Sequence, residues 1–334
     1  MTNTSTKPKI FFDTNELISY IKKENPSYLA IISSKNIFSK QRWIFDRITK
    51  TGFKSKIIFI KDGEQAKSFE QLKYVLDRFS QLSLDKKSMV LCIGGGSIGD
   101  LSGFAASIYL RGIDFINIPT TLLSQVDSAH GGKNGINFQN FKNQVGTIYE
   151  PKVIYIDTKF LKTLKRDQVV DGLGEIIKYG FIKDTSILSD LNNFHKNIQK
   201  IIKKSIACKY FYTNKDLHES SIRKILNIGH TFGHTIELKY ALSHGKAVII
   251  GMLKEFEFSE KIGLSEAGLK DKFIDTLNKL SIHINVEEYH IDMKALTHDK
   301  KVSGSSIAFP FVKKPGQSSV KKIYLHTIQK YLNE

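Results

Sequence analysis

LCIGGGSIGD, residues 91–100, joins an apolar run to a helical stretch through a glycine triplet. Glycines at such a junction let the backbone approach a pyrophosphate, whose negative charge is favoured by the N-terminus of the following helix. A tight turn between a strand and a helix would use the same glycines. The stretch therefore predicts an α/β fold, and a dinucleotide site needs support from other residues.

Apolar, β-branched runs of strand length lie on both sides of this stretch, at residues 28–32, 57–60, 88–93, 115–118 and 153–156. Amphipathic segments such as residues 66–82 separate them. Alternation of buried strands with helices is typical of a largely parallel sheet covered by helices. We therefore predict a parallel-sheet domain over residues 1–160.

The pattern changes after Lys162. Helical periodicity dominates from there to about residue 285, at residues 168–182, 198–212, 231–242, 246–262 and 265–280. We predict a second, all-helical domain over residues 161–334.

Composition restricts the class of protein. The chain has 334 residues and is 41% hydrophobic, which suits two domains. Cys92 and Cys208 stand far apart in apolar settings, as for buried thiols in a reducing compartment. The N-terminus is polar and no run of about 18 apolar residues occurs. We expect a cytoplasmic enzyme without a signal peptide or a membrane span.

The formal net charge of +17 raises the question of an anionic partner. Of the 50 basic residues, 44 are Lys, and they are scattered through helices and loops rather than clustered. This distribution argues against a nucleic-acid partner and for a local positive site that binds a small anionic substrate.

Polar side chains and glycines crowd into residues 118–143. Asp127 lies in the segment PTTLLSQVDS and Lys133 in GGKNGIN, and Lys142 and Asn143 follow shortly after. Such a segment favours a site for a small, polar anion. A glycine-rich loop with solvated lysines would have the same composition.

The helical part contains a candidate metal site. Glu175 and Lys178 are spaced i,i+3, His230 and His234 are spaced i,i+4, and His244 follows ten residues later. Three His and one Glu can supply three protein ligands to a catalytic metal and leave positions open for substrate. Spacing alone nominates His230 and His234 as a pair.

Taken in order, these segments resemble the dehydroquinate synthase family of sugar phosphate cyclases. The resemblance extends from about residue 60 to 305 and includes the spacing of Lys209 to Arg223. Its motifs are GGGSIGDLSGFAASIYLRGIDFINIPTTLLSQVDS (94–128), GGKNGIN (131–137), FKNQVG (141–146), DGLGEIIKYG (171–180), NIGHTFGHTIE (227–237), HGKAV (244–248) and HDKKV (298–302). It implies a Rossmann-like first domain, a helical second domain, an active site in the cleft between them, and a homodimer.

The resemblance also implies the site residues. The metal, zinc or cobalt, would be held by Glu175, His230 and His244, with His234 facing the substrate instead. The substrate would be surrounded by Asp127, Lys133, Lys142, Asn143, Lys178, Lys209, Arg223, Asn227 and one of Lys300 and Lys301, with Arg111 reaching its phosphate from the partner subunit. NAD would be bound by Glu64, Lys67, Gly95, Gly96, Ser97, Asp100, Thr120, Thr121, Lys133, Lys142 and Thr158.

The implied reaction belongs to the shikimate pathway of aromatic amino acid biosynthesis. A seven-carbon 2-keto sugar acid phosphate loses its phosphate and closes to a carbocycle, while NAD is regenerated within the turnover. Because this substrate carries a carboxylate and a phosphate, its site needs Lys and Arg.

Departures from the family pattern stand at four positions near these residues. Ser34 replaces an Asp that binds a cofactor ribose, although Asn36 remains. His130 and Asn134 flank Lys133 and replace a small apolar residue and a Thr, and Lys246 replaces a Glu beside His244. The changes at 130 and 134 would either repack the loop or alter substrate choice.

Two other functions stay open. A sister cyclase acting on sedoheptulose 7-phosphate or glucose 6-phosphate would keep NAD and the metal without a carboxylate site. An iron-type alcohol or glycerol dehydrogenase shares the architecture, but its third metal ligand is typically Asp where Glu175 stands here.

Overall fold

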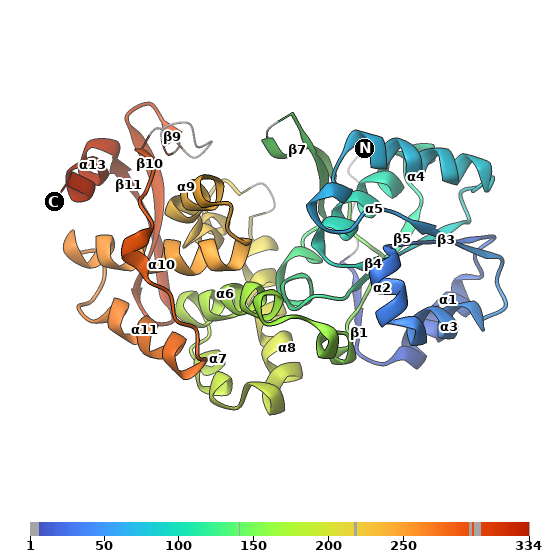
Figure 1. The fold of residues 1–334 in the computed structure, drawn as a ribbon, viewed down its shortest axis with the longest axis horizontal. Coiled ribbons are helices and arrows are strands. Elements are labelled where there is room, and N and C mark those ends of the chain that lie inside the picture. The colour runs from blue at the N-terminus through green and yellow to red at the C-terminus, as the bar shows by residue number, and fades with distance from the viewer. Residues whose placement is uncertain (1–6, 140, 217–218, 294–295, 297–301, 334) are drawn as a thin grey trace. The chain divides into compact units, whose positions relative to one another are not determined.

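The computed structural model describes residues 7–333, apart from residues 140, 217–218, 294–295 and 297–301. The chain forms two compact units, Met1–Lys165 and Arg166–Glu334, which Figure 1 shows in blue to green and in green to red. The division falls at Lys165, whereas the predicted boundary is residue 160.

The first unit is built on a six-stranded sheet in the order β1-β8-β5-β4-β2-β3, in which all neighbours are parallel. Its strands are β1 (Lys9–Phe11), β2 (Leu29–Ser33), β3 (Ser55–Phe59), β4 (Met89–Gly94), β5 (Asp114–Pro119) and β8 (Val153–Tyr155). The predicted α/β class is confirmed, and β1 is a strand that the sequence did not reveal.

Strand periodicity divides the core of this unit into two layers. Ala30 and Ile32 of β2 belong to one hydrophobic cluster, whereas Leu29 and Ile31 belong to the other. Successive side chains point to opposite faces of a sheet, so a strand buried on both faces must be apolar throughout. This explains why these strands appear in the sequence as uninterrupted apolar runs.

Helices cover both faces of the sheet (Figure 1). One face packs against α4 (Phe69–Gln81) and α5 (Gly96–Ile108), and the other against α1 (Thr14–Glu24) and α3 (Arg42–Thr49). The short α2 (Lys35–Lys40) precedes α3. Because α5 begins directly after β4, the glycine triplet lies at the carboxyl end of a central strand, where open α/β sheets bind ligands.

A separate antiparallel hairpin, β6 (Lys133–Phe138) and β7 (Phe141–Ile148), packs on α5 through β6. Most residues of β7 are exposed on both faces of the strand. The hairpin therefore carries Lys133, Lys142 and Asn143 on an element that the main sheet does not bury.

The second unit is rich in helices: α6 (Arg166–Ile182), α7 (Ser186–Asp190), α8 (Phe194–Thr213), α9 (His230–Tyr240), α10 (His244–Lys261), α11 (Leu269–Lys279) and α13 (Leu325–Asn333). The prediction of an all-helical domain needs one correction. An antiparallel sheet of β9 (Val302–Ser303), β10 (Ser306–Lys314) and β11 (Gln317–Tyr324) lies between α11 and α13 in the chain. Phe309 of β10 packs at a tilt against Phe232 and edge-on against Phe258. The sheet therefore completes the core of this unit.

Two further observations bear on the sequence predictions. Cys92 and Cys208 are both buried free thiols, and burial raises the pKa of each to about 12. Among the described residues, the structure contains no helix with the length and apolarity needed to cross a membrane.

Candidate active site

The three predicted metal ligands come together in the second unit. Glu175 lies within α6 and is 1% exposed, and His230 and His244 are the first residues of α9 and α10. Glu175 Oε1 is 3.7 Å from His230 Nε2 and 3.6 Å from His244 Nε2. One ligand atom from each residue lies within 4.8 Å of the others. Two imidazoles and a carboxylate at these distances suit a divalent ion of the zinc type, with positions left for substrate.

A carboxylate behind His244 orients this candidate ligand. Glu237 Oε2 lies 3.3 Å from His244 Nδ1, which is the ring nitrogen that faces away from Glu175. Burial lowers the pKa of His244, but Glu175 and Glu237 raise it, to about 10 overall. A metal must therefore displace a proton from this ring. Such a carboxylate–histidine pair fixes the tautomer and the orientation of a ligating imidazole.

Two polar residues flank the three candidate metal ligands, which we call the metal group. Lys178 is 2% exposed, contacts Glu175 with its ammonium and donates a hydrogen bond to the carbonyl of Leu226 at 2.8 Å. The ring of His234 packs edge-on against that of His230, with centroids 5.1 Å apart. His234 is not part of the metal group, in contrast to what spacing alone indicated, and its role toward substrate stays a prediction.

Arg223 and Asn227 follow a turn that is organised by a buried carboxylate. Asp216 accepts hydrogen bonds from the amides of Ser220, Ser221 and Arg223 at 2.9, 2.6 and 3.1 Å. Burial opposes the charge of Asp216, but these amides hold the pKa of its carboxyl well below the usual range. The side chain of Asn227 donates a hydrogen bond from Nδ2 to the carboxylate of Glu219 at 2.6 Å. Asp216 and Glu219 were not found by sequence reasoning.

Lys209 lies on α8 and is 8% exposed. The other lysine predictions, Lys300 and Lys301, fall outside the described residues.

In the first unit, the glycine turn has the geometry that a bound pyrophosphate requires. Gly95 is the N-cap of α5 and forms no side-chain cap hydrogen bond. A Cβ on Gly95 would lie 3.0 Å from Thr121 Cγ2, and one on Gly96 would lie 2.9 Å from Ser128 Oγ. The turn therefore keeps a cradle open at the positive end of a helix, which fits a dinucleotide phosphate.

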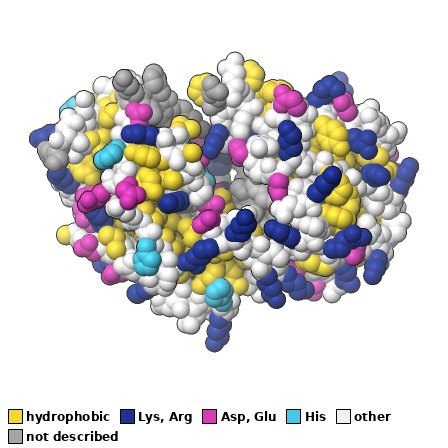
Figure 2. Space-filling model, in the orientation of Figure 1, with side chains coloured by type: hydrophobic (Ala, Val, Ile, Leu, Met, Phe, Trp, Pro, Cys, Tyr) yellow, Lys and Arg dark blue, Asp and Glu magenta, His cyan; other side chains and the backbone are white. Residues whose placement is uncertain are grey.

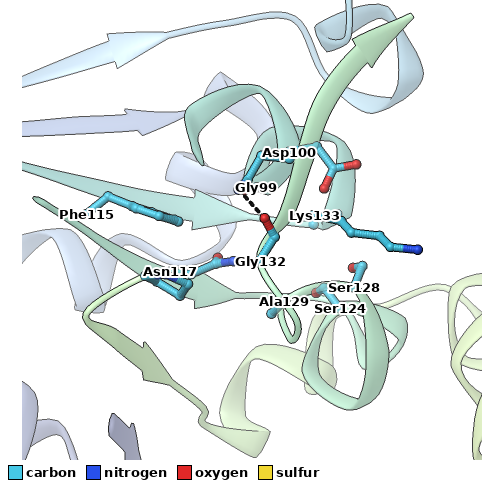
Figure 3. A pocket seen from close by; sticks show the side chains of 13 residues that line it. Gly99, Asp100, Phe115, Asn117, Ser124, Ser128, Ala129, Gly132 and Lys133 are labelled. Carbon is cyan, nitrogen blue, oxygen red and sulfur yellow. Dashed lines mark hydrogen bonds between the residues drawn. The ribbon is translucent and has the colours of Figure 1, made fainter. Parts of the chain in front are cut away.

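A small polar pocket lies beside this turn (Figure 3). Asp100, Asn117, Ser128 and Lys133 line it, and it has room for about one water molecule. In Figure 3 the side chain of Lys133 extends past Ser128 and away from Asn117. The pocket thus connects the glycine turn to the start of the β6–β7 hairpin.

Residues predicted to bind NAD and substrate share one hydrogen-bond network. The Lys67 ammonium, 5% exposed, bonds to Asp100 Oδ2 at 2.6 Å and to the side-chain oxygen of Asn143. Glu64 accepts from Ser97 Oγ at 3.1 Å and from Asn137 Nδ2 at 2.8 Å. Asn137 also accepts from the amide of Asn143 at 2.9 Å. Asn137 was missed as a functional residue, although it closes the GGKNGIN motif.

The remaining predicted residues of the first unit lie on turns. Thr120 and Thr121 follow β5, Asp127 lies in the π-helical turn Ser124–Ser128, and Thr158 begins a 3₁₀ turn. Arg111 is exposed and has a φ of 62°, directly after Leu110 with a φ of 49°. Two successive residues in the left-handed region make this a strained corner, and such corners are frequent at functional sites.

The structure assigns plain structural roles to two of the departures. Ser34 caps α2 by accepting from the amide of Ile37. Asn134 donates to the carbonyls of Gly132 and Tyr149 at 2.7 and 2.8 Å and fills the space above Gly103. These contacts support repacking of the loop.

The other two departures lie in different surroundings. His130 is 2% exposed, and its Nε2 lies 2.9 Å from the carbonyl of Gln125. Lys246 is partly exposed and lies over the ring of Tyr289, at 5.8 Å from the centroid.

Two family models match adjoining parts of the chain. The model described as 3-dehydroquinate synthase N-terminal matches residues 57–171, and the one described as 3-dehydroquinate synthase C-terminal matches residues 172–302. The chain belongs to the 3-dehydroquinate synthase family.

Relatives in this family cover nearly the whole chain. The 3-dehydroquinate synthase of Dictyoglomus thermophilum is 41% identical over 329 residues, which are 94% of this chain and 91% of the relative. That of Alkaliphilus metalliredigens is 37% identical over 314 residues, 89% of this chain and 86% of the relative. The predicted resemblance to the 3-dehydroquinate synthase family is thereby confirmed.

Solved structures show the same fold at lower identity. A 2-deoxy-scyllo-inosose synthase complexed with carbaglucose-6-phosphate, NAD⁺ and Co²⁺ superposes with a TM-score of 0.86 at 23% identity, covering 98% of this chain and 99% of that one. A 2-epi-5-epi-valiolone synthase from Streptomyces hygroscopicus with NAD⁺ and Zn²⁺ gives 0.86 at 22% identity, with 100% and 98% covered. An iron-containing alcohol dehydrogenase gives 0.61 at 14% identity, with 98% and 96% covered. The fold of the 3-dehydroquinate synthase family is thus shared with enzymes of other activities.

Proposed function

We propose that this chain catalyses the 3-dehydroquinate synthase reaction, which converts 3-deoxy-D-arabino-heptulosonate 7-phosphate to 3-dehydroquinate and phosphate. The observation that carries the proposal is the convergence of Glu175, His230 and His244 within 4.8 Å, in a chain of this family. The reaction would serve the shikimate pathway in the cytoplasm, where the two free thiols would stay reduced.

The cofactors follow from the two sites described above. Glu175, His230 and His244 would hold zinc or cobalt, and a divalent ion there supplies the Lewis acidity that lowers the pKa of a substrate hydroxyl. The turn at Gly95 and Gly96 would hold the pyrophosphate of NAD, which supplies a reversible hydride acceptor. Structures of the same fold that contain NAD⁺ with Co²⁺ or Zn²⁺ support this assignment.

Cationic side chains of the chain would bind the anionic groups of the substrate. Arg223, held by its backbone to Asp216, is suited to pair with a carboxylate because a guanidinium can donate two parallel hydrogen bonds. Lys209 and Lys133 would add positive charge, and Asn227 would orient a hydroxyl. Lys178, buried against Glu175, would limit the negative charge that the metal ligands present to the substrate.

Sister cyclases are the second candidate, because their solved structures have this fold and one holds a sugar phosphate analogue. The identities of 22–23% to those enzymes are well below the 32–41% to the 3-dehydroquinate synthases. The reductases and dehydrogenases of the same fold superpose less well, with TM-scores of 0.58–0.66. The heptulosonate phosphate is therefore the favoured substrate.

The proposed reaction is redox-neutral overall, and this separates it from a dehydrogenase. With NAD far below the substrate concentration, phosphate and NADH are followed together. We expect many phosphates released per NAD and no accumulation of NADH. Equal NADH and product, with the substrate phosphate retained, would reject the proposal. Faster phosphate release from glucose 6-phosphate or sedoheptulose 7-phosphate than from the heptulosonate would assign the chain to a sister cyclase.

We also propose a homodimer in which Arg111 serves the site of the partner subunit. Large apolar side chains are exposed at the end of α5 and on the β6–β7 hairpin: Ile108, Leu110, Phe138, Phe141 and Ile148, which are 40–63% exposed. Of these, Ile148 follows Thr147, which hydrogen-bonds to Ser107 beside Ile108, so apolar surface lies near the strained Arg111 corner and supports an interface between two copies.

Mixing two inactive variants tests this arrangement. In a hybrid of Arg111→Ala and His230→Ala subunits, one site receives both the native Arg111 and the native His230. After subunits are mixed and exchanged at equal amounts, we expect recovery of about a quarter of the native activity, because half the dimers are hybrids with one complete site each. No recovery, with exchange verified by mass spectrometry, would place Arg111 in its own subunit's site.

A further inference from the structure

The first turn of α9 receives its cap from another helix. Its N-cap residue is Gly229, which has no side chain to accept hydrogen bonds from the first amides. Glu255, near the middle of α10, takes this role. Its Oε2 accepts from the amide of Gly229 at 2.7 Å, and its Oε1 accepts from those of Thr231 and Phe232 at 2.9 and 3.2 Å.

This carboxylate is held firmly because it is buried. Glu255 is 2% exposed, and a buried charge is stable only where hydrogen bonds replace its hydration. The three amides belong to the positive end of a helix, which favours a carboxylate further. The position of the side chain is therefore determined by the first turn of α9.

The two helices that Glu255 joins carry the histidine ligands of the metal group. His230 is the first residue of α9, and His244 is the first residue of α10. Their backbones touch one helical turn before Glu255, where a Cβ on Gly251 would lie 1.9 Å from the carbonyl oxygen of Gly229. Because His244 and Glu255 belong to one rigid helix, the cap fixes the start of α9 relative to His244.

We propose that Glu255 is a positioning residue of the metal centre, which sets the place of His230 relative to His244 by capping α9 from α10. The inference rests on the metal site of the proposed function. Glu255 accepts hydrogen bonds from the amides of Gly229 and Thr231, the two neighbours of His230 in the chain. It acts through the backbone on both sides of His230.

Cobalt binding tests the inference without any assay of turnover. Metal-free protein is titrated with Co²⁺, the dissociation constant is measured by competition with a chelator, and the visible d–d bands are recorded. In Glu255→Gln, an NH₂ group faces backbone amides that are themselves donors. We expect the dissociation constant to rise on the order of 10- to 100-fold, as for other supporting groups of metal ligands, with altered d–d bands.

Glu257→Gln is the matched control. It removes the same charge from the same helix, but Glu257 is 45% exposed and pairs with Lys270 at 3.2 Å. Its cobalt affinity and bands should equal those of the native protein. Should Glu255→Gln fail to fold, Glu255→Asp keeps the charge on a shorter side chain and should give a smaller change in the same direction.

The outcomes separate this inference from the proposed function. Lower thermal stability of Glu255→Gln with unchanged cobalt affinity and bands would show a merely structural role and overturn the inference. Native protein that binds Co²⁺ but releases no phosphate would reject the function and leave the positioning role standing. Native protein that binds no Co²⁺ would overturn both.

Discussion

Arg223 combines burial with a fixed backbone. It is 4% exposed, and its amide donates to Asp216 at 3.1 Å, so its side chain has little freedom to move. The substitution Arg223→Ala should lower kcat/KM for the heptulosonate. The loss should correspond to about 2–5 kcal/mol of transition-state stabilisation, the cost of removing one member of a desolvated charge pair. Steady-state kinetics measure this loss. Lys224→Ala, next to it and more exposed, should change kcat/KM little, and an equal loss in both variants would contradict the assignment.

Asp190 illustrates how a buried carboxylate makes stability depend on pH. Burial opposes its charge, but hydrogen bonds from Lys200 and Lys204 at 2.7 and 2.6 Å hold the pKa of Asp190 below its ordinary value. A lowered pKa in the folded state stabilises the protein above the unfolded pKa of about 3.9, and this contribution is lost as the pH falls through the folded pKa.

Asp190→Asn should therefore lower the free energy of unfolding at pH 7, and its difference from the native protein should shrink below about pH 4. Urea unfolding at both pH values measures this difference. Asp46→Asn is the control, because Asp46 pairs with Arg42 at the surface and is 49% exposed, so its effect should be small at either pH. A difference for Asp190→Asn that does not shrink as the pH falls below about 4 would refute the electrostatic account.

Candidate ligand-binding residues were easier to predict from the sequence than the residues that support them. Glu175, His230 and His244 carry side chains whose chemistry is recognisable in the sequence, and the family resemblance selected the same three residues, without His234, that lie close together in the structure. Asp216, Asn137 and Glu255 act on backbone amides instead. An amide has no sequence signature, so their partners become visible only in three dimensions.

At the scale of elements, the crossing of α9 and α10 depends on glycine. A Cβ on Gly251 would lie 1.9 Å from the carbonyl oxygen of Gly229 and 2.8 Å from the amide nitrogen of Gly233. Because both atoms belong to backbone, no side chain can rotate away. Gly251→Ala should destabilise the second unit by about 1–3 kcal/mol or more. The free energy of unfolding in denaturant gives the value.

Gly99→Ala provides the comparison for this effect. Gly99 is also helical, but its added Cβ would meet the side chain of Asn117 at ordinary distances, 3.5 Å from Nδ2 and 3.8 Å from Oδ1. Alanine is the better helix former, so this change should be neutral or slightly stabilising. If Gly251→Ala behaves in the same way, the helices are not in backbone contact at this point.

Whether a segment forms a helix or a strand was predictable where its buried residues recur at a regular spacing. The four central strands, β2, β4, β5 and β8, are almost wholly buried, and α6 and α8–α11 have long helical periods. In β11, QSSVKKIY, exposed and partly buried positions alternate, and Ile323 is its only buried residue among those described. Its place in a sheet depends on pairing with β10, a contact across the turn that local periodicity does not encode.

At the scale of the whole molecule, positive charge is spread rather than concentrated. Figure 2 shows Lys and Arg side chains scattered over the visible face among acidic and hydrophobic ones. With a net charge of +17, the protein as a whole attracts anions, and the range of this attraction is the screening length set by the salt concentration. Such a field accelerates the encounter with a substrate bearing a carboxylate and a phosphate.

Activity should therefore depend on ionic strength. Raising NaCl from about 50 to about 500 mM shortens the screening length roughly threefold, and kcat/KM for the heptulosonate phosphate should fall several-fold. Kinetics at constant pH and saturating NAD and metal measure the fall. Sucrose at equal osmolality should leave kcat/KM nearly unchanged apart from viscosity. A salt-independent kcat/KM would mean that only local contacts attract the substrate.

The Asn134 side chain also constrains the order in which this protein can change over generations. It occupies the space where a Cβ on Gly103 would lie, 1.9 Å from its Oδ1, and it bonds to the carbonyls of Gly132 and Tyr149. A lineage that holds asparagine at 134 can acquire alanine at 103 only if this side chain turns away and gives up its two hydrogen bonds. Replacement of Asn134 removes that cost, so the two sites are epistatic, and the fitness of a substitution at 103 depends on the ancestor in which it arises.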